Sequence, residues 1–328
     1  MTELDCAVFG TGLLPTLLAG LLASRHGRKV VRVGRRRSAQ RLPRGLDLAL
    51  PLSVHPMSWR LVRRGTAELA ALGAEIGLRK GVSEVEVALA ADQPDSAAAL
   101  DHLAHLALGY GHQVRRADAG WALRRVPRLD PEGLAEGLAA WLDRLGVATM
   151  EAGPVDAALT ILADDAAVLD GVGAAQRPAA LVAPAMTASL VVAPRGLPVP
   201  IQIFPDRGVT LAQRGDGTVL ALASGAEAVA PRLAACLAGP FPMKRLASTR
   251  YRGLATRDGA PLVGRLKRTR TVVIAGLGST GAFLAPVLAR LIAGTPEADE
   301  KRWAAAHHPS APRAALADFA PLGGEAGA

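Results

Sequence analysis

The N-terminal stretch CAVFGTGLLPTLLAGLLASRHGRKVVRVGRRR, residues 6–37, decides the fold. A short apolar run at 6–9 enters the turn Gly10-Thr11-Gly12, and apolar residues at helical spacing follow over 13–25. The next β-prone run is 30–33. This order of strand, glycine turn, helix and strand is typical of the first unit of a dinucleotide-binding fold.

The glycine turn carries the chemistry of that unit. The first glycine permits a tight turn, the second lets the backbone approach a pyrophosphate, and the helix N-terminus supplies N–H groups with partial positive charge. Pro15 replaces the usual third glycine; proline is tolerated in a first helical turn, but its bulk changes the packing of helix on strand. We predict that Gly10, Gly12, Leu13 and Leu14 hold the ligand's phosphates.

The end of the second strand departs from the usual pattern. Gly34 stands where such folds place an acid for the ribose hydroxyls, and three arginines follow it. Losing that hydrogen-bonded pair costs about 1–3 kcal/mol. Arg35 or Arg36 could compensate by meeting the pyrophosphate or stacking on adenine, so we predict both as cofactor-binding residues. We also expect Gly34→Glu to tighten binding.

A second glycine turn, AGLGSTG at 275–281, lies near the other end of the chain, between the buried run 271–275 and the helical run 282–292. A plain strand-to-helix connection is one interpretation. The other, which we favour, is that both chain ends build one ligand-binding domain with the middle of the chain inserted. The inserted part contains a hairpin signal at 208–224, around Gly215-Asp216-Gly217.

Composition sets limits on the class of protein. Half of the 328 residues are hydrophobic and only 3% are aromatic, so the core must consist of Ala, Leu and Val. The two cysteines, Cys6 and Cys236, imply no disulfide framework. The first residues contain acids and no basic region, and no apolar run reaches about 20 residues, so we expect a cytoplasmic protein with no transmembrane segment.

The net charge of +9 is concentrated in residues 1–65, which hold twelve Lys and Arg against three acids. This excess is either a solvated surface or an attraction for a phosphate-bearing ligand, an acidic partner subunit or a peripheral membrane surface. Nucleic acid is not expected, because no aromatic residues are interleaved with the arginines. His102 and His105 lie next to Asp101 but have no Glu or Cys neighbour, so a solvated helix face is favoured and no metal is expected.

The segments in this order resemble the FAD-dependent D-amino-acid oxidase superfamily, which includes glycine oxidase and sarcosine oxidase-like enzymes. The resemblance runs over most of residues 5–295. It is strongest over 251–294, in YRGLATRDGAPLVGRL and VVIAGLGSTGAFLAPVLARLIAG. The N-terminal stretch is also similar to the Rab escort and GDP-dissociation-inhibitor branch of the same fold, but that branch lacks the C-terminal resemblance.

The resemblance implies FAD as the cofactor, with the second glycine turn facing the flavin ring. There a helix N-terminus would stabilise negative charge on the reduced ring. The residues implied for this role are Gly276, Gly278, Ser279, Thr280 and Gly281. Ala183, in the segment 181–184, stands where the superfamily usually has Ala-Gly beside the cofactor, and Pro184 removes a backbone N–H there.

The substrate end departs from the superfamily as well. Its substrate-binding arginine follows a Gly-Leu pair, whereas Gly253-Leu254 is followed by Ala255 in this chain. Tyr251 and Arg252 precede that pair, and we predict them as the catalytic residues. The alternative interpretation is that both are solvent-facing strand residues.

We expect an α/β fold: a Rossmann-like FAD-binding domain from 1–65, 131–185 and 246–295, a mainly antiparallel-sheet substrate domain from 66–130 and 186–245, and a tail at 296–328. The predicted function is oxidation of a C–N bond of a small-molecule amine or amino acid by hydride transfer to flavin. The alternative is a non-catalytic binding or scaffolding subunit with a vestigial flavin site in a hetero-oligomer. A hydroxylase is less favoured because its late Gly-Asp-Ala motif is absent from the sequence.

Overall fold

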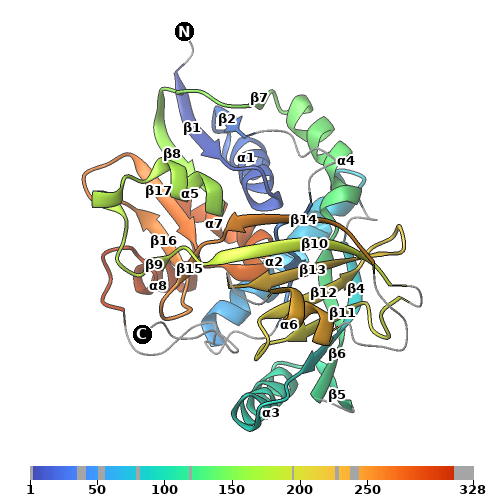
Figure 1. Ribbon diagram of the computed structural model, residues 1–328. Coiled ribbons are helices and arrows are strands. Elements are labelled where there is room, and N and C mark those ends of the chain that lie inside the picture. The colour runs from blue at the N-terminus through green and yellow to red at the C-terminus, as the bar shows by residue number, and fades with distance from the viewer. Residues whose placement is uncertain are drawn as a thin grey trace.

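The computed structural model describes residues 3–34, 42–50, 56–78, 82–117, 120–193, 196–225, 229–236 and 244–313. Two large sheets organise them (Figure 1). The six-stranded sheet has the order β16-β17-β8-β1-β2-β7, parallel apart from β16. Its strands are β1 (Leu4–Phe9), β2 (Val30–Val33), β7 (Ala148–Met150), β8 (Ala157–Leu162), β16 (Leu262–Arg265) and β17 (Thr271–Ala275).

The two chain ends meet in this sheet. Strands β1 and β17 both pair in parallel with β8, one on each side, so the glycine turns that follow them lie at the same edge (Figure 1). Figure 1 shows β1 and α1 (Leu13–His26), in blue, beside β17 and α7 (Ala285–Ala293), in orange. The chain is an α/β protein with a Rossmann-like sheet, as the sequence predicted.

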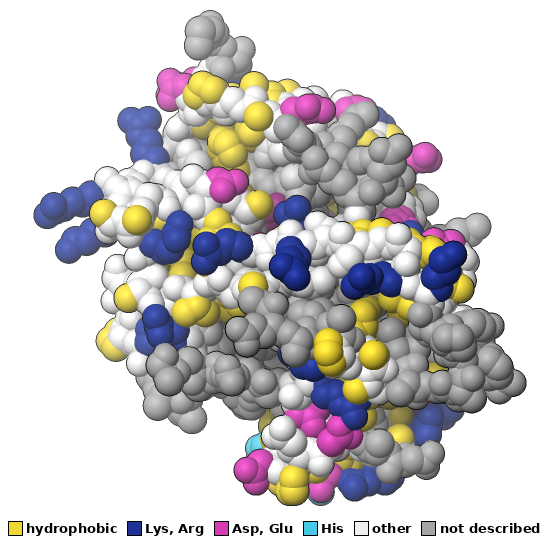
Figure 2. Space-filling model, in the orientation of Figure 1, with side chains coloured by type: hydrophobic (Ala, Val, Ile, Leu, Met, Phe, Trp, Pro, Cys, Tyr) yellow, Lys and Arg dark blue, Asp and Glu magenta, His cyan; other side chains and the backbone are white. Residues whose placement is uncertain are grey.

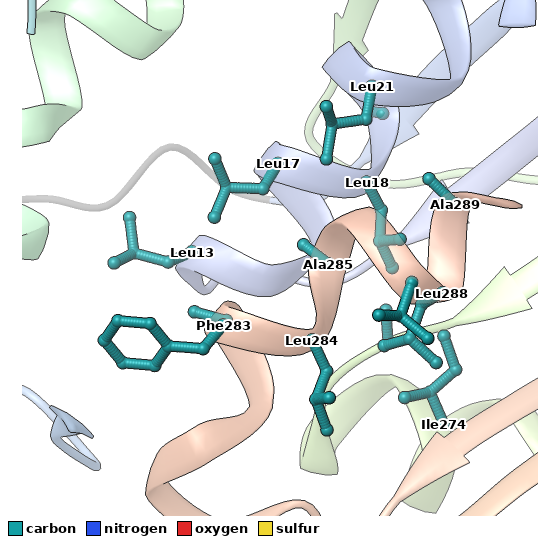
Figure 3. Close-up of a cluster of buried hydrophobic side chains, with 14 of the residues drawn as sticks. Leu13, Leu17, Leu18, Leu21, Ile274, Phe283, Leu284, Ala285, Leu288 and Ala289 are labelled. Atoms are coloured by element: carbon teal, nitrogen blue, oxygen red, sulfur yellow. The ribbon is translucent and has the colours of Figure 1, made fainter. Parts of the chain in front are cut away.

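The main core lies between the helices on one face of this sheet. Side chains of α1 pack against η3 (Gly278–Leu284) and α7, as Figure 3 shows for Leu17, Leu18, Phe283 and Leu288. Trp141 from α4 (Pro131–Arg144) fits over Gly20, where an added Cβ would lie 2.1 Å from the ring. Helix α5 (Asp165–Gly171) packs on β8 and β17, while α2 (Pro56–Glu75) and α8 (Ala298–Ala306) pack on each other and on α7.

The second sheet is mainly antiparallel, with the order β14-β10-β13-β12-β11-β4-β6-β3, and β5 pairs with β6. The predicted hairpin is confirmed: β12 and β13 pair antiparallel, and the Asp216 carboxylate accepts hydrogen bonds from Thr218 in the turn. Its strands are β3 (Asp47–Leu48), β4 (Val82–Ala90), β5 (Gln113–Ala117), β6 (Gly120–Leu129), β10 (Ala185–Val192), β11 (Ile201–Phe204), β12 (Val209–Gln213), β13 (Thr218–Ser224) and β14 (Lys244–Arg252). Smaller elements are α3 (Pro94–Gly109), α6 (Val229–Cys236), η2 (Ala174–Gln176) and the pair β9 (Leu181–Val182) and β15 (Ala255–Thr256).

Several elements cross the segment boundaries drawn from the sequence. Strand β3 and most of β14, from residue 246 on, belong to the second sheet, although these residues fall in segments assigned to the first domain. Helix α2 continues past residue 65 and packs on η3, α7 and α8. The segment assigned to a tail contains α8, in which Glu300 and Trp303 are buried. Trp303 Nε1 donates a hydrogen bond to Ser58 Oγ in α2 over 2.7 Å.

Among the helices that the structure describes, none combines the length and the apolar character needed to cross a membrane.

Candidate functional site

A large cavity of about 1270 Å³ opens where the carboxyl edge of the six-stranded sheet meets the second sheet. Ligands of open α/β sheets bind beyond the carboxyl ends of the strands, and this cavity exceeds the roughly 300–1,000 Å³ of a small-molecule site. Both glycine turns line it, at Gly10–Leu14 and at Gly276–Ser279, and Met186 and Tyr251 line it from the second sheet. The cavity therefore has room for a dinucleotide together with a small substrate.

The first glycine turn is built for close approach of the main chain. Gly10 has φ +144°, and a Cβ there would lie 2.8 Å from Pro15 Cγ and 2.9 Å from Asp164 Oδ2. Among the residues that the structure describes, none accepts a hydrogen bond from the N–H groups of Gly12, Leu13 and Leu14. These three amides open helix α1 toward the cavity, which is the arrangement that binds phosphate.

Gly34 closes the same corner. Its N–H donates to the Met150 carbonyl, and a Cβ on it would lie only 2.3 Å from the Gly10 carbonyl oxygen. An acidic side chain therefore cannot be added at 34 without moving the turn, which is contrary to the expectation that Gly34→Glu would tighten binding. The two arginines predicted to compensate, Arg35 and Arg36, lie outside the described residues.

Sequence reasoning missed two acidic residues in this corner. Asp164 follows β8, next to β1, and its Oδ2 accepts from Thr11 N over 2.6 Å and from Thr11 Oγ1 over 3.3 Å. Its Oδ1 accepts from Ala167 N over 2.8 Å and so caps helix α5. The signal was present in the sequence as an Asp-Asp pair directly after the apolar run 158–162, where parallel strands carry their ligand-facing residues.

Asp165 points to the other side of the cavity. Its Oδ2 accepts from Leu254 N over 2.9 Å, where the chain leaves β14. Burial, opposed by the Leu254 hydrogen bond and assisted by the neighbouring Asp164 charge, raises the pKa of its carboxyl to about 6. Asp165 has protein around it and is nevertheless exposed to solvent, because its side chain lines the open cavity.

The second glycine turn supplies the opposite wall. Gly276 and Gly278 have φ of +69° and +52°, and a Cβ on Gly278 would meet no atom within 4 Å, so this main chain faces open space. Ser279 Oγ donates to the Leu48 carbonyl over 3.2 Å, which ties the turn to β3. Gly281 also lines the cavity. Thr280 is buried, is not among the lining residues, and donates to the Leu277 carbonyl.

The predicted catalytic residues both line the cavity. Tyr251 OH donates to the Arg44 carbonyl over 2.6 Å, and burial raises the pKa of its hydroxyl to about 12, so it stays protonated. Arg252 is exposed, and its Nη2 lies 3.4 Å from the Ala183 carbonyl. Ala183 itself is not among the lining residues.

These residues fit a flavin dinucleotide in space and in main-chain donors. The main chain of the turn 276–281 borders open space at Gly278. The amides of Gly12, Leu13 and Leu14, which have no acceptor among the described residues, can donate hydrogen bonds to an anion. One charge conflicts with the fit, because the Asp164 carboxylate already lies on the Thr11 amide of the same turn.

Comparison with solved structures finds the same fold. Glycine oxidase from Geobacillus kaustophilus superposes with a TM-score of 0.69 at 18% identity, over 90% of this chain and 96% of that chain. L-proline dehydrogenase from P. horikoshii gives 0.71 at 15% identity, over 94% and 97%. Iminodiacetate oxidase from Chelativorans sp. BNC1 gives 0.67 at 17% identity, over 89% and 95%.

Compared by sequence, the chain matches no protein-family model and no curated protein. The resemblance to amino-acid oxidases that the sequence motifs indicated is thus confirmed in the fold.

Proposed function

We propose that the chain binds FAD in the cavity between its two sheets and oxidises a C–N bond of an amine or amino acid. The observation that carries this proposal is the meeting of both glycine turns, from opposite ends of the chain, in one cavity of about 1270 Å³. The fold shared with amino-acid oxidases and an L-proline dehydrogenase supports the same class of reaction.

The chain's own residues would bind the cofactor and orient the substrate. The amides of Gly12, Leu13 and Leu14, which have no acceptor among the described residues, suit the pyrophosphate, and the main chain at Gly278 and Ser279 suits the edge of the flavin ring. A bound flavin would supply the hydride acceptor. Amine oxidation of this kind depends on placing a neutral amine near the ring more than on a strong base.

We propose Tyr251 and Arg252, which line the cavity from the second sheet, as the residues that meet the substrate. Because the pKa of the Tyr251 hydroxyl is about 12, Tyr251 can donate a hydrogen bond but does not act as a base near neutral pH. Arg252 carries a positive charge on this wall, as does Arg44 over the Tyr251 ring, and it is our candidate to bind a substrate carboxylate.

A second candidate function is a non-catalytic subunit with a vestigial flavin site. The contact of the Asp164 carboxylate with the Thr11 amide favours it, because a carboxylate repels a pyrophosphate. The strand β14 also offers a surface for an acidic partner: it forms one edge of the second sheet and exposes Lys244, Arg245, Arg250 and Arg252. Figure 2 shows Lys and Arg side chains in a band across this face.

The test is flavin binding followed by turnover. The full chain, purified and titrated with FAD, should develop a protein-bound flavin spectrum, and small amines or amino acids should then bleach it in the absence of oxygen. Arg252→Met should weaken bleaching by carboxylate-bearing substrates while leaving FAD binding unchanged. A chain that stays colourless at saturating FAD contradicts the enzyme proposal and leaves the binding subunit as the function.

A further inference from the structure

We infer that the Asp164 carboxylate, held on the first glycine turn, sets the affinity of this site for dinucleotides by opposing their pyrophosphate. This inference rests on the proposed flavin site. It assigns to one side chain the selection against a phosphate-bearing ligand.

The position of Asp164 is fixed from two sides. Oδ2 receives the Thr11 N–H over 2.6 Å and lies beside Gly10, while Oδ1 receives the Ala167 N–H over 2.8 Å. Both oxygens are therefore committed, one to the glycine turn and one to the first turn of α5. The side chain cannot swing away to admit a phosphate without giving up a helix cap as well.

The negative charge of Asp164 at this position would repel a pyrophosphate. The N-terminal end of α1 attracts an anion, and the carboxylate on Thr11 already supplies one negative charge at that end. A pyrophosphate on the neighbouring amides of Gly12, Leu13 and Leu14 would bring further negative charge within a few ångströms, in a partly buried site where screening is weak. The acid that normally holds the ribose is absent at Gly34, so that contact does not offset the repulsion.

Asp165 provides the matched control. It is the adjacent residue, also acidic and also lining the cavity, but its carboxylate is bonded to Leu254 on the opposite side and has no contact with the glycine turn. A general effect of negative charge in the cavity would act through both residues. An effect of the carboxylate on the turn would act through Asp164 alone.

The experiment compares three full-length chains: the unaltered protein, Asp164→Asn and Asp165→Asn. Asparagine keeps the size of the side chain and removes the charge, and its one acceptor oxygen can accept from either Thr11 or Ala167 but not from both. Asp164→Ser, which also caps, is the second variant if the first folds poorly. Each chain is titrated with FAD and, separately, with riboflavin, which has the same ring and no phosphate, and bound flavin is followed by fluorescence quenching.

We expect Asp164→Asn to bind FAD at least tenfold more tightly than the unaltered chain, with riboflavin binding changed less than twofold. Asp165→Asn should change FAD binding less than threefold. Equal FAD affinity in the unaltered chain and Asp164→Asn, or an equal gain from Asp165→Asn, overturns the inference and leaves the flavin site standing. If none of the chains binds FAD or riboflavin, the proposed function fails and the inference fails with it.

Discussion

Gly34 shows how the packing of one residue can exclude the acidic side chain that dinucleotide-binding folds usually have at this position. The Gly10 carbonyl oxygen lies 2.3 Å from the place of a Cβ at 34, and a main-chain oxygen in a packed turn has little freedom to move. The lack of an acid at this position is thus tied to the shape of the turn. Restoring the ribose contact would require changes at both residues.

We therefore predict that Gly34→Ala lowers the free energy of unfolding by about 1–3 kcal/mol, the usual cost of overpacking. The control is Gly215→Ala, in the hairpin turn, where an added Cβ meets no atom within 4 Å and stability should stay within about 0.5 kcal/mol. Urea unfolding of both variants measures the difference. A Gly34→Ala protein as stable as the control would show that the turn yields easily.

Asp165 gives a prediction in pH. Its pKa is raised to about 6 in the folded protein, above its ordinary value of 3.8, so the folded state holds this proton more tightly than the unfolded chain. The stability it contributes is complete below pH 4 and is lost as the pH rises through about 6. Because the side chain meets solvent in the cavity, we expect a loss of only about 1 kcal/mol.

Asp165→Asn keeps an acceptor for Leu254 and removes the titration. Between pH 4 and pH 7.5 it should therefore lose about 1 kcal/mol less unfolding free energy than the unaltered protein. Chemical denaturation at the two pH values measures this. Equal losses of unfolding free energy in the two proteins would mean that Asp165 is not the group with the raised pKa.

At the scale of elements, helix α2 approaches η3 through a glycine. A Cβ on Gly65 would lie 1.8 Å from the Phe283 carbonyl oxygen, so the two elements touch main chain to main chain. Gly73, in the same helix, has its nearest foreign atom at 3.5 Å, an ordinary contact. The helix thus carries one glycine that packing requires and one that it does not.

Gly65→Ala should destabilise the protein by about 1–3 kcal/mol, because α2 must shift away from η3. Gly73→Ala should stabilise it by about 0.5–1 kcal/mol, since alanine is the better helix former. Thermal unfolding of the two variants should move the melting temperature in opposite directions. A shift of the same sign in both would mean that α2 does not rest on η3 at Gly65.

At the scale of the whole molecule, one carboxylate joins helices from three parts of the chain. Glu300 of α8 is fully buried, bonds Arg64 of α2 and accepts from Arg290 Nη2 of α7 over 2.6 Å. These ion pairs, together with Trp303, fasten residues beyond 296 to the core.

Glu300→Gln should cost about 1–3 kcal/mol of unfolding free energy, because it removes the buried charge that Arg64 and Arg290 share, while Arg290 keeps Glu68 and Arg64 keeps Glu297. Glu75→Gln is the control, since the pair of Glu75 with Arg25 is about half exposed and should contribute less than 1 kcal/mol. Denaturant titration of the two variants tests this. Equal losses would mean that Glu300 is no more important than a surface pair.

The sequence predicted what local patterns encode. The unit around Gly10, the strand before Gly276 and the hairpin at 208–224 carry their periodicity and turn residues in short windows, and the structure has all three. Helix α8 was missed because its charged residues look like a solvated tail until Arg64 and Arg290 are brought to Glu300 from elsewhere in the chain.

The site was predictable to the same degree. The glycine turns are recognisable from their spacing in the sequence, and most of the predicted cofactor residues line the cavity. The Asp-Asp pair marked the position of Asp164, but its contact with Thr11 was not predictable, because Thr11 is 153 residues away and meets it through the pairing of β1 with β8. Ala183 was chosen by likeness of a short apolar segment, and that segment pairs with β15 away from the cavity.

The sheet order β17-β8-β1 also bears on how the protein is made. Strand β1 leaves the ribosome before β8, and β17, which completes the other side of β8, emerges after every strand of the second sheet. Until then the newly made chain carries an open parallel edge, which is a template for pairing with other chains. Chaperone contact during translation should therefore persist until the residues of β17 have been synthesised.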